Sequence, residues 1–143
     1  MASIHRETTI DVPAQQVWDA LADVGALHTR LVPGFVADCE LDGRVRTVTF
    51  GTGMTARETI LDVDAARMRV AWLAEAEGLE HYNASAQVIY AGDDACRVVW
   101  IADLLPDAAA PGIAGMIEQG LAAMKHHQEQ THVAGGQESG SRN

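Results

Sequence analysis

The last apolar run of the chain, residues 111–128, has the repeat of an amphipathic helix. Its apolar residues recur every three or four positions, so they fall on one stripe, and Glu118, Ala122 and Lys125 fall opposite. The stripe consists of Ile113, Met116, Ile117, Gly120, Leu121 and Met124. Burial of these side chains does not offset the backbone entropy of ordering the segment, about 1–2 kcal/mol per residue. The pattern therefore predicts a helix that lies on a large apolar surface.

The rest of the chain has the alternation of β-strands. Residues 3–12 alternate polar and apolar positions, and six further segments follow at 35–41, 44–50, 56–64, 68–75, 82–91 and 96–104. Short breaks separate the later segments and carry turn residues such as Asp42-Gly43. Because connections of this length are hairpins, we expect an antiparallel sheet in which consecutive strands are neighbours.

Two short helices are expected between the first and second strands. Pro13 opens the first helix, Val17 and Trp18 lie on its apolar face, and Gly25 ends it. The second covers residues 26–32, before Pro33-Gly34. This order of elements predicts an α+β helix-grip fold, in which a seven-stranded antiparallel sheet wraps around a long C-terminal helix.

The predicted domain covers residues 1–130. Residues 131–143 contain one large apolar residue, Val133, and are rich in Gly, Ser and Gln. A segment of this composition cannot bury enough apolar surface to offset its ordering entropy, so we expect a disordered C-terminal tail.

The composition of the chain limits which classes of molecule it can bind and where it is expected to work. The chain has 143 residues and a net charge of -10, which disfavours nucleic acid and anionic membranes because like charges repel. It shows neither a signal peptide nor an apolar stretch long enough for a membrane span. Cys39 and Cys96 fit no metal spacing and are expected to be reduced. We therefore expect a cytoplasmic protein. The sequence leaves a monomer and a homodimer open as its oligomeric state.

Several short motifs resemble the START-like (SRPBCC) superfamily, specifically its bacterial polyketide cyclase/dehydrase-type branch. The resemblance covers residues 3–129. Its carriers are Asp11-Val12-Pro13-Ala14 with Val17-Trp18, Cys39-Glu40-Leu41 before Gly43, Val45-Arg46, Glu58-Thr59-Ile60 before Asp62, Val98 with Trp100, and Gly120-Leu121 with Lys125. Their order and spacing, rather than any single motif, carry the resemblance.

The middle of the chain also resembles the plant abscisic-acid receptors of this superfamily. Thr52-Gly53-Met54 stands at their gate loop and Leu79-Glu80-His81-Tyr82-Asn83 at their latch, while Phe35, Glu58 and Tyr82 match pocket residues. Pro33 replaces the lysine that anchors the hormone's carboxylate, and Trp100 replaces a second pocket glutamate. The resemblance thus implies a cavity between sheet and helix, entered between two loops, but not hormone reception.

Strand parity supplies a list of side chains that face the helix. If Glu58 faces it, Ile60 and Asp62 of the same strand should do so too. Together with the helix stripe and the resemblance, this predicts ligand contacts by Phe35, Val48, Phe50, Glu58, Val70, Trp72, Leu79, Tyr82, Trp100, Ile113, Ile117 and Leu121. Mostly apolar walls with a few polar groups are typical of small-molecule sites. The same residues would also serve as an ordinary hydrophobic core.

Glu58 is the most specific single candidate for a functional side chain. A carboxylate on an apolar face must be neutralised, paired or solvated, and it could then transfer a proton or anchor a ligand, with Tyr82 as second polar group. The alternative is an edge glutamate paired with Arg57 or Arg46 in solvent. Gly120 has two interpretations as well: close approach of the helix to the sheet, or space for a bound molecule.

Neither a metal nor a cofactor is expected. His126, His127 and His132 contain no i, i+4 pair, and neither a phosphate loop nor a nucleophile motif is present. The leading hypothesis is reversible, cofactor-free binding of a small hydrophobic or aromatic molecule. Two alternatives stay open: a cyclase/dehydrase-type enzyme that uses Glu58 and Tyr82 as catalytic residues on a polyketide-like substrate, and a protein-interaction module that acts through the loops at the cavity entrance.

Overall fold

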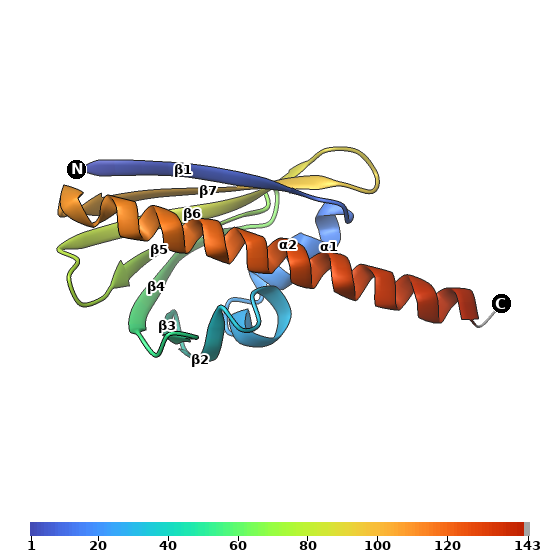
Figure 1. Ribbon diagram of the computed structural model, residues 1–143, viewed down its shortest axis with the longest axis horizontal. Helices are drawn as coiled ribbons and strands as arrows, with labels where there is room; N and C mark the ends of the chain where they lie inside the picture. Colours follow the sequence, from blue (N-terminus) through green and yellow to red (C-terminus); the bar gives the residue numbers. More distant parts are fainter. Residues whose placement is uncertain (142–143) are drawn as a thin grey trace.

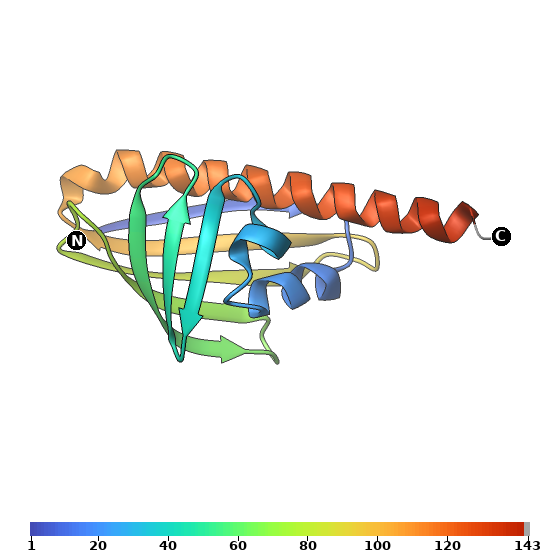
Figure 2. The ribbon, with the colours of Figure 1, turned by 90° about the horizontal axis from the view of Figure 1, so that it is seen from below.

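A computed structural model describes residues 1–141, with side chains placed through Ala134. It has the helix-grip fold that the sequence predicts: an antiparallel sheet curves beneath one long C-terminal helix (Figures 1 and 2). The elements in chain order are β1 (Ala2–Ile10), α1 (Ala14–Ala22), the π-helical turn η1 (Leu27–Leu31), β2 (Val36–Asp42), β3 (Val45–Phe50), β4 (Thr55–Asp64), β5 (Arg69–Glu75), β6 (His81–Tyr90), β7 (Cys96–Leu105), the 3-10 turn η2 (Asp107–Ala109) and α2 (Ala110–Ser141).

The seven strands follow the order β1-β7-β6-β5-β4-β3-β2. Consecutive strands from β2 to β7 pair in antiparallel register through hairpins, and β1 closes the sheet against β7. Every strand begins and ends within two residues of its predicted position. The core lies between the sheet, α1, η1 and α2, and it contains the stripe residues Ile117, Leu121 and Met124.

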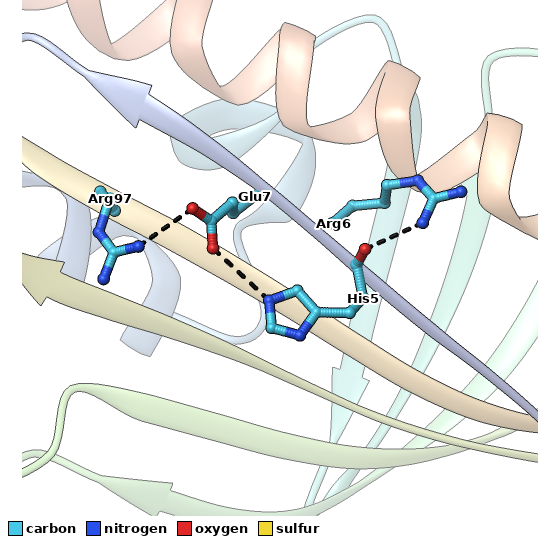
Figure 3. Close-up of polar contacts among 4 residues, drawn as sticks. All are labelled: His5, Arg6, Glu7 and Arg97. Carbon is cyan, nitrogen blue, oxygen red and sulfur yellow. Dashed lines mark hydrogen bonds and ion pairs between the residues drawn. The ribbon is translucent and has the colours of Figure 1, made fainter.

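Side-chain alternation along β1 is visible directly (Figure 3). His5 and Glu7 lie on the outer face, where Glu7 Oε1 accepts a bond of 3.0 Å from Arg97 Nη1. Arg6 points the other way, toward α2, and its Nε lies 3.3 Å from Glu118 Oε1. These pairs are exposed and contribute little stability. They do show which face of β1 the helix covers.

The C-terminal half of α2 is tied to the domain by polar contacts. Lys125 Nζ donates to the Thr9 carbonyl at 2.8 Å, and Glu129 Oε2 accepts the Asp11 N–H at 2.9 Å. On the opposite side, the buried Gln128 donates through Nε2 to the Arg30 carbonyl at 2.8 Å. This half of the helix is therefore held by both β1 and η1.

Strand β4 contains a β-bulge that changes the predicted pattern. Ile60 pairs with Trp72, and the next pair is Asp62 with Ala71. The step between these pairs is two residues on β4 but only one residue on β5. The extra residue reverses parity beyond Ile60, because side chains alternate with a period of two. The expectation that Asp62 faces the helix is therefore wrong, and Asp62 is exposed.

The C-terminal end differs from expectation too. α2 continues through Ser141, whereas a disordered tail was predicted from Thr131. Its last turns extend past the sheet (Figure 1), and residues 131–134 are exposed. Residues 142 and 143 lie outside the described part of the chain. Within that part, no helix is both long and apolar enough to cross a membrane.

Gly120 explains how closely α2 approaches the sheet. A Cβ atom at this position would lie 3.0 Å from Trp100 Cζ3 and 3.1 Å from Phe35 Cε2. The first interpretation of Gly120, close approach, is therefore correct. A Cβ atom at Gly115, in the same helix, would have none of these neighbouring atoms within 4 Å.

These two glycines give a matched test of that packing. Gly115→Ala should raise the free energy of unfolding by about 0.5–1 kcal/mol, because alanine loses less backbone entropy in a helix. Gly120→Ala gains the same entropic stabilisation, but the new methyl group forces the rings of Trp100 and Phe35 to move, which costs about 1–3 kcal/mol. Its net effect should therefore be a lower free energy of unfolding. Urea unfolding of both variants measures the difference. Equal stabilisation by the two substitutions would show that the helix does not need a glycine at position 120.

Candidate functional site

A cavity of about 360 Å³ lies between the sheet and α2. Its floor is formed by inward-facing strand residues such as Val48 and Trp72, and Ile113 and Ile117 of α2 form its roof. Leu27 and Leu31 of η1 close one side. Nearly all of the wall is apolar, because the parity that buries these strands places their aliphatic and aromatic side chains here.

The cavity is lined at one end by two loops. The β3–β4 turn contributes Met54, which is 40% exposed, and the β5–β6 turn contributes Glu77, Gly78 and Leu79. Both turns lie at the same end of the sheet, because two antiparallel strands, β4 and β5, separate them. The first turn is fixed in place: the Gly51 N–H donates to the Phe35 carbonyl at 2.9 Å. We call this end the cavity mouth.

Most residues predicted to contact a ligand line this cavity. They are Phe35, Val48, Phe50, Glu58, Trp72, Leu79, Tyr82, Trp100, Ile113 and Ile117. Val70 and Leu121 do not line it, although both are buried in the surrounding core. Val70 stands near the start of β5, at the end of that strand away from the mouth. Ligand contact by all of these residues stays a prediction.

Glu58 faces the cavity and is paired. Its Oε1 accepts a hydrogen bond of 2.7 Å from Arg46 Nε, and the two side chains are only 11% and 4% exposed. The pair forms because Arg46 and Glu58 are direct neighbours across β3 and β4. Glu58 is therefore not an edge residue paired in solvent, and of the two candidate partners Arg46 is the one that it uses.

Arg46 also connects the site to the helical side. Its Nη1 donates to the Val24 carbonyl at 3.1 Å, just before η1, and its guanidinium carbon lies 5.4 Å from the centroid of the Trp72 ring. Arg46 is not among the wall residues predicted from the sequence, although it lines the cavity. The signal was present, because Arg46 has the same parity as Val48 and Phe50.

Tyr82 is the third polar group in the wall and is 7% exposed. Burial, followed by the nearby negative charge of Glu58, raises the pKa of its phenol far above the ordinary value. Tyr82 is therefore a neutral hydroxyl that can both donate and accept hydrogen bonds.

The two tryptophans of the wall form an edge-to-face pair. The ring centroids of Trp72 and Trp100 lie 5.8 Å apart with an interplanar angle of 68°. Such pairs are favourable because the positive edge of one ring meets the negative face of the other. Across residues 1–134, neither indole N–H has a hydrogen-bond partner.

The described residues contain no group of three or more His, Cys, Asp or Glu side chains that could hold a metal ion. The polar groups of the cavity interior are the Arg46–Glu58 ion pair, the Tyr82 phenol and the two indole N–H groups. Such a set can orient a molecule by hydrogen bonding or exchange protons with it.

Comparison with known structures shows the same fold in several proteins. A START superfamily protein from Mycobacterium smegmatis aligns with a TM-score of 0.74 at 12% identity, over 90% of this chain and 98% of that chain. The di-domain ARO/CYC BexL from the BE-7585A biosynthetic pathway aligns with a TM-score of 0.72 at 18% identity, over 90% of this chain and 47% of that one. Norcoclaurine synthase from Thalictrum flavum, in complex with dopamine and hydroxybenzaldehyde, gives 0.69 at 21% identity, over 93% and 87%.

The sequence comparison is more specific. No curated protein matches the chain. The family model described as polyketide cyclase / dehydrase and lipid transport matches residues 1–129, which cover the whole sheet and the part of α2 that packs on it. The predicted START-like resemblance is thereby confirmed. This chain belongs to the polyketide cyclase / dehydrase and lipid transport family.

Proposed function

We propose that this protein reversibly binds a small hydrophobic or aromatic molecule in the cavity between the sheet and α2. The observation that carries the proposal is the cavity itself: about 360 Å³, with an apolar wall and three convergent polar residues. Volumes of about 300–1,000 Å³ with this composition are typical of small-molecule sites. A core that only had to be stable would be filled, because empty space forfeits packing contacts.

Two properties of relatives support the proposal. The family description names lipid transport alongside cyclase and dehydrase activity. Norcoclaurine synthase, which shares the fold, has been solved with two small aromatic compounds. Neither property identifies the molecule that this chain binds.

The test begins with the purified protein. We expect native mass spectrometry to reveal a co-purified small molecule, and titration of the emptied protein with apolar aromatic compounds to change tryptophan fluorescence saturably. Trp72 and Trp100 should report binding because both are in the wall. Trp18, which is buried outside the cavity lining, can be replaced by phenylalanine to isolate their signal.

A variant with a filled cavity is the matched control. Ala86 is buried and lines the cavity, so Ala86→Phe should place its ring in the empty space and abolish binding. Undiminished binding by folded Ala86→Phe protein would contradict the proposed location. Failure of the wild-type protein to bind any compound would contradict the function.

The second candidate is an enzyme of the cyclase/dehydrase type, with Glu58 and Tyr82 moving protons on a polyketide-like substrate. The favouring observation is that both residues line one cavity, where the charge of Glu58 acts on the phenol of Tyr82. Mass analysis of each compound after incubation separates the candidates: a binder returns the compound unchanged, whereas an enzyme releases product. The interaction module acting through the mouth loops stays a prediction.

A further inference from the structure

We infer that the ligand of this cavity is uncharged and carries a hydroxyl or phenol group, which sits against the Arg46–Glu58 pair. This inference rests on the proposed function and concerns the chemistry of the molecule bound. Three features of the wall carry it: its charge balance, its unused hydrogen-bonding atoms, and the cost of placing a further charge there.

The interior of the cavity is electrically balanced. Among the described residues that line it, Arg46 and Glu58 are the only buried charged ones, and they pair with each other at 2.7 Å. The remaining charged residue of the wall, Glu77, is exposed at the mouth. A charged ligand would therefore find no free countercharge in the interior.

The pair leaves specific atoms unused. Arg46 donates through Nε and Nη1, and Glu58 accepts through Oε1. Within residues 1–134, Arg46 Nη2 and Glu58 Oε2 make no hydrogen bond, and neither atom is completely buried. One donor and one acceptor thus remain for a ligand.

A hydroxyl group matches this set, because it can accept from Arg46 Nη2 while it donates to Glu58 Oε2. A carboxylate would instead compete with Glu58 for Arg46 and leave one carboxylate unpaired in an apolar wall. An ammonium would compete with Arg46 in the same way. A buried charge without a partner is strongly unfavourable, so both should be rejected.

Calorimetric titration at neutral pH with three compounds of one ring system tests this. The probes are 2-naphthol, which is neutral, 2-naphthoate and protonated 2-naphthylmethylamine. We expect wild-type protein to bind 2-naphthol at least about tenfold more tightly than either charged compound, in keeping with the value of a hydrogen bond to a charged group.

Variants of the pair should change the ranking in opposite directions. Glu58→Gln leaves Arg46 without its countercharge, so affinity for 2-naphthoate relative to 2-naphthol should rise about tenfold or more. Arg46→Gln should do the same for the amine. The control is Glu75→Gln: Glu75 is exposed at the end of β5 and outside the cavity wall, and its loss removes the same charge without changing the ranking.

The outcomes separate the two proposals. If no probe binds to folded wild-type protein, the proposed function fails for this chemistry and the inference falls with it. If the probes bind but a charged compound equals or exceeds 2-naphthol, only the inference is overturned. An unchanged ranking in folded Glu58→Gln protein also overturns it, and the wild-type ranking decides the matter if that variant does not fold.

Discussion

Arg46→Met is expected to lower the free energy of unfolding by about 3–5 kcal/mol, the usual cost of removing one partner from a buried ion pair. The side chain is 4% exposed and makes contacts on three sides: with Glu58, with the Val24 carbonyl and over the Trp72 ring. Methionine keeps much of the volume but leaves Glu58 charged and unpaired. Guanidinium unfolding followed by far-UV circular dichroism measures the loss.

Two further variants show whether the pair is responsible. Arg57 follows the opposite parity on β4 and is exposed, so Arg57→Met should cost less than about 0.5 kcal/mol. The double variant Arg46→Met/Glu58→Leu should regain much of the loss, because it removes both charges at once. A double variant that is less stable than Arg46→Met would mean that the charges themselves stabilise the fold.

Leu121→Ala is expected to cost about 2–5 kcal/mol, the range for truncating a large core side chain. Leu121 is 3% exposed and belongs to the hydrophobic core beneath α2. Since it does not line the cavity, the space that its truncation leaves cannot simply merge with an existing void. Urea midpoints for the variant and the wild type give the difference.

The neighbouring position on the helix supplies the control. Ala122 is exposed, so Ala122→Ser should change stability by less than about 0.5 kcal/mol. Similar losses at both positions would contradict the orientation of α2 described here. A large loss at Leu121 alone would support it.

The fold could be predicted because the local signals agree with one another. Turn residues such as Asp42-Gly43 separate strands whose alternation has a single buried phase, and hairpin connections permit one strand order. The stripe around Ile117 and Leu121 needs an apolar surface, and this sheet is the only such surface that the described chain offers. Several cavity residues, including Val48 and Trp72, follow from the same alternation.

The errors occurred where position depends on pairing rather than on pattern. The bulge after Ile60 cannot be recognised from β4 alone, because it exists only relative to β5; this is why Asp62 was misplaced. Arg46 was overlooked because a charged residue on a buried face is usually absent, and here cross-strand register supplies the partner that makes it tolerable. Parity also cannot say how far along a strand a cavity reaches, which is why Val70 was included.

One half of α2 attaches the helix to the domain and the other half lines the cavity, and this separation affects how the protein can evolve. The polar contacts of Lys125, Gln128 and Glu129 hold one half of the helix, while the other half presents Ile113 and Ile117 to the cavity. That second half meets the sheet through the exposed hydrogen bond of Arg6 with Glu118. Descendants of such a chain can therefore acquire a new cavity shape through substitutions in two turns of one helix, with the strand ladder and the helix attachment inherited intact.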